Sequence, residues 1–336
     1  MDNEEEDNAL IAQNNFFDQT GYSDRQVMQI GNAETQNLAI HFNGEIKVSD
    51  SAQVYLHGGR NYREGKSAGF YRFPKDEDRV ITDLFPNGFS PEILTDIQDD
   101  AVTLGLKGSK HNWGIDFSHT IGMNALDYTI NNSNNASLGI ASPTTFYAGG
   151  FLYSQNTSNL DLSKSFDWRS GLNFSFGAEL RVENYQIGAG EEASYVNGGS
   201  VFTSSDGLEE PRIAGAQVFP GIQPENELNK FRTNSSFYID IEANVNDKWL
   251  VQLAARNELY NDFGSQVIWK VASRYKLNDN TSLRGGIATG FRAPSLHQVF
   301  FQNISTQFID GNILQVGTFN NESALTAQAF NVDRLS

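Results

Sequence analysis

The sequence of 336 residues contains no cysteine, so neither a disulfide framework nor a thiolate metal site can form. This absence suits an oxidising compartment, where free thiols are a hazard. Basic residues are also scarce: 24 Lys and Arg stand against 41 Asp and Glu, which gives a formal net charge of −17. Because binding to nucleic acid requires clustered Lys and Arg, this charge argues against a nucleic-acid partner.

Long hydrophobic runs are missing too. No segment approaches the roughly 18 apolar residues of a membrane-spanning helix. The chain opens with the mostly acidic segment Met1–Asp7, which lacks the basic and apolar regions of a signal peptide. Hydropathy alone therefore suggests a soluble acidic protein. Strands of a membrane barrel alternate between apolar and polar residues, however, so the absence of long apolar runs does not exclude them.

Alternation between apolar and polar residues is the dominant pattern. It is clearest in Asn37–Val48, Leu172–Glu183 and Ser236–Val245, where apolar residues hold one parity. Successive side chains of a strand point to opposite faces, so each segment has one apolar and one polar face. Weaker matches occupy Ala52–Gly59, Val102–Gly108, Asn112–Met123, Phe151–Ser163, Trp249–Arg256, Val267–Lys276 and Ser282–Arg292. The sequence therefore predicts an all-β chain of about ten strands.

The expected connections alternate between short and long. Tight turns are expected near residues 49–51, 109–111, 164–167, 246–248 and 277–280, and longer links over 61–99, 124–150, 184–233 and 257–265. Outer-membrane barrels have this asymmetry, because their periplasmic turns are short and their extracellular loops are long. Two polar stretches, Asn8–Asp18 and Pro91–Asp99, are expected to form single helical turns within loops. The short turns predict an antiparallel meander, in which each strand pairs with its sequence neighbour.

The positions of the tryptophans support a membrane barrel. Trp113, Trp168 and Trp249 each follow a short turn by one to three residues and hold the apolar parity of a strand. Aromatic girdles at membrane interfaces have this position and this facing. The alternative is that these side chains pack the closed end of a soluble sandwich core.

The segment Ser282–Leu296 reads SLRGGIATGFRAPSL and resembles the barrel signature of TonB-dependent receptors. In that family a strand leads through this run into a long outer loop. The matching residues are Gly290, Phe291, Arg292, Ala293, Pro294, Ser295 and Leu296. We expect Phe291 to face lipid, Arg292 to point inward and Pro294, which lacks a ladder donor, to help end the strand.

Further segments are similar to the same family. Asp262–Ser265, followed by Lys270 and Arg274, looks like the preceding hairpin. Gly21–Gln26 and Phe85–Phe89 are similar to loop motifs of members from Bacteroidota-like bacteria.

The resemblance implies a barrel of about 22 strands closed around a plug. The sequence supplies about ten strands and shows no plug-like domain or TonB-binding box, so we expect an incomplete segment of such a wall. Residues 1–36 are assigned to an extracellular loop segment, 37–293 to the partial barrel and 294–336 to a truncated extracellular loop segment.

The resemblance also implies a function. The parent protein is expected in the outer membrane of a Gram-negative bacterium, where it takes up a scarce solute with energy from TonB. The implied partners are membrane lipid, the receptor's own plug and, through the plug, the TonB complex. The solute stays open among a siderophore, a vitamin, a glycan and a peptide.

Charged residues on polar strand faces are the candidate functional residues. We expect the following side chains to face the lumen and to contact the plug or the solute electrostatically: Glu179, Arg181, Asp240, Glu242, Arg256, Arg284 and Arg292. No enzyme motif or cofactor motif appears, so neither catalysis nor a cofactor is expected. His41 and His57 share the lumen-facing parity, but without a third ligand a polar lining is preferred to a metal site.

Two other functions remain open from the sequence. A passive porin-like barrel without a plug would share the alternation and the loop asymmetry. A secreted all-β adhesion or glycan-binding protein would share the strands but would dissolve without detergent.

Overall fold

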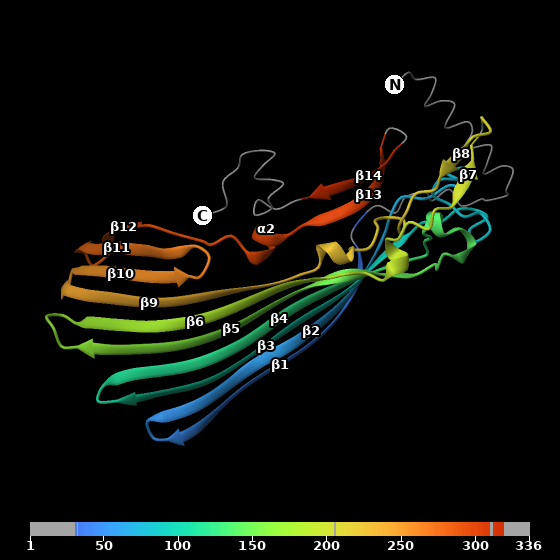
Figure 1. Cartoon of the computed structure of the whole chain (residues 1–336). Coiled ribbons are helices and arrows are strands. Elements are labelled where there is room, and N and C mark those ends of the chain that lie inside the picture. Colours follow the sequence, from blue (N-terminus) through green and yellow to red (C-terminus); the bar gives the residue numbers. More distant parts are fainter. Residues whose placement is uncertain (1–30, 32, 205, 310–311, 319–336) are drawn as a thin grey trace.

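The computed structural model describes residues 31, 33–204, 206–309 and 312–318. Ten strands form one antiparallel sheet whose order follows the chain (Figure 1). They are β1 (Glu34–Ser49), β2 (Ala52–Ala68), β3 (Glu92–Lys110), β4 (Trp113–Asn131), β5 (Phe146–Phe166), β6 (Leu172–Gly188), β9 (Leu228–Asn246), β10 (Trp249–Tyr260), β11 (Gly264–Asn278) and β12 (Thr281–Ala288). The predicted all-β meander is confirmed. The sheet does not close on itself, and β1 and β12 are its edges.

Short hairpins and short helical elements lie in the segments outside the main sheet. Two short hairpins, β7 (Val201–Thr203) with β8 (Glu209–Pro211) and β13 (Asn303–Ile309) with β14 (Asn312–Thr318), lie outside the main sheet. The helical elements are η1 (Ala136–Ala141), η2 (Glu192–Ser194), η3 (Pro224–Asn226) and α2 (Leu296–Phe300). No helix in the part of the chain that the structure describes has the length and apolar character needed to cross a membrane.

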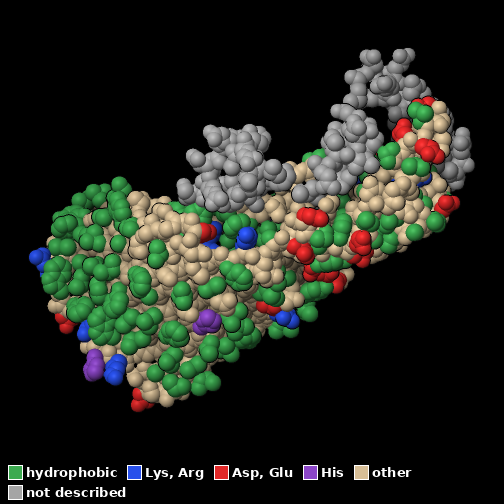
Figure 2. Space-filling model, viewed as in Figure 1, with side chains coloured by type: hydrophobic (Ala, Val, Ile, Leu, Met, Phe, Trp, Pro, Cys, Tyr) green, Lys and Arg blue, Asp and Glu red, His purple; other side chains and the backbone are tan. Residues whose placement is uncertain are grey.

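The two faces of the sheet differ in chemistry, as the alternation predicts. The outer face, defined by the parity of Phe176 and Ile239, carries large apolar side chains that are exposed; Phe237 is 64% exposed. The short turns, such as residues 111–112, lie at one end of the sheet, called the turn end below, and the long loops, such as residues 69–91, lie at the other, called the loop end. Figure 2 shows apolar side chains gathered over the turn end and acidic side chains towards the loop end. This apolar belt includes Leu38, Ile40, Phe42, Leu104, Leu106, Phe117, Leu160, Phe176, Phe237, Ile239, Leu253, Val267, Trp269, Val271, Leu283 and Ile287. A contiguous apolar surface of this extent marks contact with lipid or with another apolar surface.

Long strands carry the sheet well beyond that belt. The strand β5 has 21 residues and β9 has 19, whereas about 9–11 suffice to cross a membrane. Above the belt the outer face of β2 and β3 becomes polar. Arg60 pairs with Asp100 at 2.6 Å there, and the Tyr62 hydroxyl donates to Asp96 at 2.7 Å. The strands therefore continue past the apolar zone towards the long loops.

The tight turns lie near their predicted places. His111 and Asn112, with φ of 54° and 64°, form a two-residue turn between β3 and β4. Two consecutive positive φ values match the twist of antiparallel strands. The predicted longer link at residues 257–265 is wrong: only residues 261–263 separate β10 from β11. Gly264, the first residue of β11, has a φ of 69°, a left-handed conformation that glycine adopts without steric cost.

Two other local predictions are wrong. Pro91–Asp99 is not a helical turn, because β3 begins at Glu92 and pairs with strands on both sides. Its polar composition indicated a turn within a loop, but the sheet itself extends into the polar zone. Trp168 lies in the turn of residues 167–171 rather than on a strand, whereas Trp113 and Trp249 begin β4 and β10. The predicted turn at Asn8–Asp18 lies outside the described residues.

The segment after β12 departs most from expectation. The strand ends at Ala288, so the prediction of a strand to Arg292 is four residues too long. Residues 289–301, called the strap below, turn onto the inner face, and a capping box of Ser295 and Gln298 starts α2. Leu296, 1% exposed, packs against Tyr185 and Ile187 of β6. Phe291 contacts the ring of Tyr260 instead of facing lipid.

The best-buried core lies at the loop end. Ile130, Phe146, Ala148 and Ala216 form a buried cluster where β4 and β5 meet the loop of residues 189–227. Polar side chains join the loops to one another: the buried Asn134 amide donates to the Arg79 carbonyl at 2.8 Å and accepts from the Ile81 amide at 3.1 Å. The long loops therefore form an ordered layer at one end of the sheet.

Candidate functional site

A cluster of charged side chains occupies the inner face of β6, β9 and β10. The register sets Glu179, Ser236 and Glu258 side by side on these three strands. Arg256 bridges the two carboxylates, with Nη2 3.3 Å from Glu179 and Nε donating to Glu258 at 2.8 Å. Arg181 lies 3.7 Å from Glu179. Alternating opposite charges along neighbouring strands stabilise each other, so this part of the wall stays polar without net repulsion.

Arg232 connects the charged cluster to the strap. Its side chain is 2% exposed, and Nε donates to Asp262 at 2.7 Å while Nη1 donates to the Pro294 carbonyl at 2.7 Å. Glu183 lies 4.0 Å from Nη1, and the guanidinium lies 5.0 Å from the centre of the Phe263 ring. One buried cation therefore holds together β6, β9, the β10–β11 turn and the strap. A buried charge is tolerated only when it is paired in this manner.

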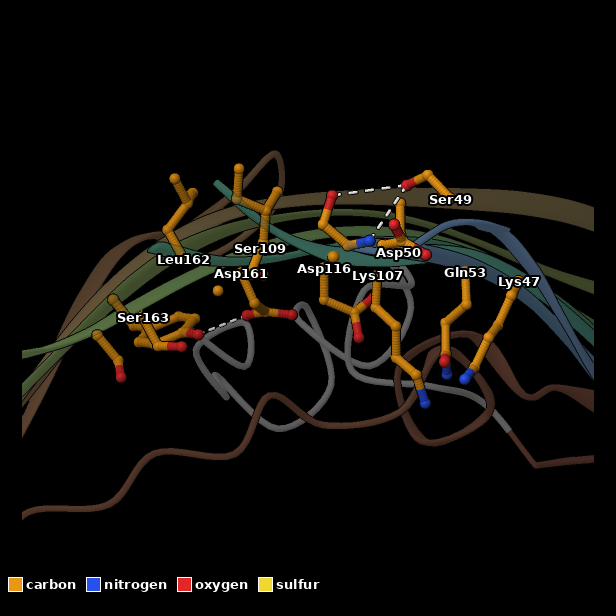
Figure 3. A pocket seen from close by; sticks show the side chains of 17 residues that line it. Lys47, Ser49, Asp50, Gln53, Lys107, Ser109, Asp116, Asp161, Leu162 and Ser163 are labelled. Atoms are coloured by element: carbon orange, nitrogen blue, oxygen red, sulfur yellow. Dashed lines mark hydrogen bonds between the residues drawn. The ribbon is translucent and has the colours of Figure 1, made fainter. Parts of the chain in front are cut away.

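Nearer the turn end, two tyrosines reach across the inner face towards a pair of aspartates. Figure 3 shows Asp116, Asp161, Lys107 and Gln53 projecting from the concave side of the arched sheet, while Leu162 projects from the other side. The Tyr55 hydroxyl donates to Asp116 at 2.8 Å, and the Tyr238 hydroxyl donates to Asp161. A cavity of about 470 Å³ lies here.

Glycines make room for these tyrosines. The Tyr238 ring lies over Gly177, where an added Cβ would be only 2.5 Å from the ring and 2.6 Å from the Leu160 carbonyl oxygen. The Tyr55 ring covers Gly105 in the same way. Asp116 and Asp161 are direct partners on β4 and β5, so each tyrosine donor offsets part of a like-charge repulsion.

The sequence-predicted residues fall into separate places. Glu179, Arg181 and Arg256 meet in the charged cluster. Asp240, nearer the turn end, accepts from Gln252 at 3.1 Å, and Glu242 follows it on the same face of β9. Two others lie apart from the cluster: Arg284 sits opposite Arg274 on the β12 edge, and Arg292 lies in the strap, beyond the strand, with an exposed side chain.

Sequence reasoning missed several residues of the inner wall. Glu258 and Tyr238 share the parity of Arg256 and Asp240, so the alternation carried a signal for both. Arg232 was assigned to the predicted link of residues 184–233, although β9 begins at Leu228. His41 and His57 share the inner parity but are not direct partners, since His41 faces Gly59 and His57 faces Asn43.

A larger cavity, of about 910 Å³, lies at the loop end between the ordered loops, the wall and the end of the strap. This cavity, called the vestibule below, has a row of contacting rings along one side. Phe219 and Tyr128 are 5.7 Å apart between ring centres, Tyr128 and Phe151 are 6.3 Å apart, and Phe151 and Phe301 are 6.2 Å apart. Its size is typical of cavities that hold small ligands.

The fold, the apolar belt and the charged inner wall together describe one wall of an outer-membrane barrel. A family model described as TonB dependent receptor-like, beta-barrel, matches residues 12–329. The chain belongs to the TonB-dependent receptor β-barrel family. Membership implies the outer membrane of a Gram-negative bacterium as its location.

Solved structures agree on the fold. The chain is similar to the siderophore receptor PirA from Acinetobacter baumannii, with 14% identity and a TM-score of 0.53 over 85% of this chain and 38% of that one. It is also similar to the ferric enterobactin receptor PfeA from Pseudomonas aeruginosa, with 12% identity and a TM-score of 0.55 over 87% of this chain and 39% of that one. The chain thus spans less than half the length of these two receptors.

Proposed function

We propose that this chain forms part of the wall and the outer vestibule of a receptor that takes up a scarce small solute actively. The observation that carries the proposal is the combination of an exposed apolar outer face with a charged inner face and a ligand-sized cavity at the loop end. Lipid covers the outer face in this arrangement. The solute first binds in the vestibule and then passes along the polar inner face.

Inner-wall charges have electrostatic roles in this proposal. Glu179, Arg181, Asp240, Glu242, Arg256 and Arg284 line the lumen and contact the receptor's plug or the passing solute. Arg292, in the strap, borders the same space. Energy reaches the receptor through the plug and the TonB complex, as in the family. Neither bond chemistry nor a cofactor is needed for this transport.

Uptake by intact cells tests this proposal. Cells that carry the complete receptor are given radiolabelled candidates from each solute class: a ferric siderophore, cobalamin, an oligosaccharide and a peptide. We expect one class to accumulate, and we expect accumulation to stop when TonB is deleted or the proton gradient is collapsed. Uptake that continues unchanged without TonB would instead indicate the passive porin-like barrel.

A further inference from the structure

The charge of the vestibule is opposite to the charge of the chain. The net charge of the whole sequence is −17, yet Arg72 and Arg79 are the charged residues that line this cavity within the described part of the chain. Both come from the loop of residues 69–91, which lies between β2 and β3. The cavity is therefore lined by positive charge although the chain as a whole is acidic, and the contacts of the two arginines show how this charge is held.

Arg72 is held in place without a carboxylate. Its Nε donates to Gln217 Oε1 at 3.2 Å, and its Nη1 donates to the Phe70 carbonyl at 2.8 Å. Arg79, by contrast, lies 3.3 Å from Asp78. Among the described residues, no Asp or Glu lies within ion-pair distance of Arg72. Its guanidinium is therefore positioned by neutral acceptors, and the nearby carboxylates of Asp76 and Asp78 act on its charge only from beyond ion-pair distance.

The position of Arg72 is electrostatically unfavourable. Burial, and then the nearby positive charge of Arg79, lower the pKa of Arg72 below its usual value, and the opposing effect of Asp76 and Asp78 offsets this only in part. Arginine nevertheless stays protonated in proteins, so the cost appears as unfavourable electrostatic energy. An anion bound in the vestibule removes that cost, and the planar guanidinium is suited to bind carboxylate, sulfonate or phosphate oxygens.

The remaining lining defines the rest of the ligand. The ring row of Phe219, Tyr128, Phe151 and Phe301 forms an apolar wall in which neighbouring rings meet edge to face or tilted. The described lining of the cavity contains no carboxylate. Aliphatic side chains complete the walls: Ile93, Ile187, Ile213, Val218 and Ile222. Rings and aliphatic groups bind apolar ligand surface, while a few placed polar groups fix its orientation.

We propose that the vestibule binds a compact anionic solute with an apolar body, whose acid group contacts Arg72 and whose apolar part lies along the ring row. This inference rests on the proposed function, because it names the class of solute that the receptor captures. Two sources share this chemistry: aromatic acids and the carboxyl end of an apolar peptide.

Equilibrium binding to the complete receptor in lipid nanodiscs tests the inference. The probes are 2-naphthoate and its neutral counterpart 2-naphthamide, with N-acetyl-Phe-Phe and its amide as the peptide pair. We expect the acid of at least one pair to bind about tenfold more tightly than its amide, since hydrogen bonds to charged groups are the strong ones. The pair that shows this preference identifies the source.

Variants of the arginine provide the control. Arg72→Gln should abolish the preference for the acid and leave the amide affinity unchanged, and Arg72→Lys should restore part of it. Arg63→Gln removes an exposed arginine on β2, outside the vestibule lining, and should change neither affinity. Equal binding of acid and amide, a preference that survives Arg72→Gln, or no binding of any probe would overturn the inference.

The two proposals fail separately. A receptor that shows TonB-dependent uptake but no acid preference would disprove the anion site and leave the proposed function intact. A receptor that binds the acids through Arg72 but takes up nothing when energised would disprove the proposed uptake function and leave the anion site intact.

Discussion

Replacing Arg232 should release the strap from the inner wall. The change Arg232→Met keeps most of the side-chain volume but leaves Asp262 and the Pro294 carbonyl without their donor, both now at 2.7 Å. Removing one partner of a buried ion pair costs about 3–5 kcal/mol. Asp262 retains 27% side-chain exposure, so water compensates it in part and the lower end of that range applies. We expect the free energy of strap opening to fall by about 3 kcal/mol.

Hydrogen exchange measures this opening directly. The backbone amides of Val299 and Phe301 are protected by bonds within the strap, to Ser295 and His297. If the strap opens as a unit, a loss of about 3 kcal/mol accelerates their exchange about a hundredfold. Arg63→Met serves as the control and should leave both rates unchanged.

A second substitution separates charge from packing. Adding Asp262→Asn to Arg232→Met removes the carboxylate that has lost its arginine partner. The double variant should therefore regain part of the lost protection of the strap amides. Unchanged exchange of the strap amides in Arg232→Met would refute the reasoning, because the strap would then be held by its apolar contacts alone.

Three further substitutions have defined outcomes. Ile239→Arg should lower the stability of the barrel folded in lipid vesicles by about 2–4 kcal/mol in urea titrations if the site is near mid-membrane, while Asp240→Arg, on the opposite face, should cost much less. Gly177→Val should cost about 1–3 kcal/mol in the same titration because the new side chain meets a tyrosine ring and a backbone oxygen, whereas Gly285→Val meets nothing within 4 Å and should be nearly neutral. Burial lowers the pKa of His297, so the unfolded state binds more protons once the pH falls below about 6.5. Strap protection in hydrogen exchange should therefore be full above that pH and decline below it, and His297→Gln should remove this pH dependence; a decline that persists in that variant would exclude the histidine as its cause.

The sequence predicted the sheet well because alternation and turn length act locally. A period of two fixes which face each residue of Ser236–Val245 occupies, and short turns leave each strand only its sequence neighbour to pair with. Polar strand extensions were misread for the same reason. In Pro91–Asp99 the sheet continues into water, so neither face is consistently apolar and the pattern resembles a loop.

Features that depend on distant contacts could not be predicted from local pattern. The strap leaves the sheet after Ala288, and only the tertiary contacts of Leu296 and Arg232 fix its course over the inner wall. The vestibule likewise combines Arg72, Tyr128 and Phe301 from segments far apart in the chain. Charged lumen candidates were predictable as a class from parity, but their partners follow from strand register across β6, β9 and β10.

Labelling along β9 tests the assignment of faces most directly. This chain has no cysteine, so a single cysteine placed at Ile239, Asp240, Ile241 or Glu242 is the one spin-label site that the chain supplies to the folded receptor in lipid bilayers. Labels at Ile239 and Ile241 should be accessible to oxygen dissolved in the lipid, and labels at Asp240 and Glu242 should be accessible to a water-soluble nickel reagent or shielded from both. Lipid accessibility at Asp240 and Glu242, or no alternation along the four positions, would contradict a barrel wall with its apolar belt in the membrane.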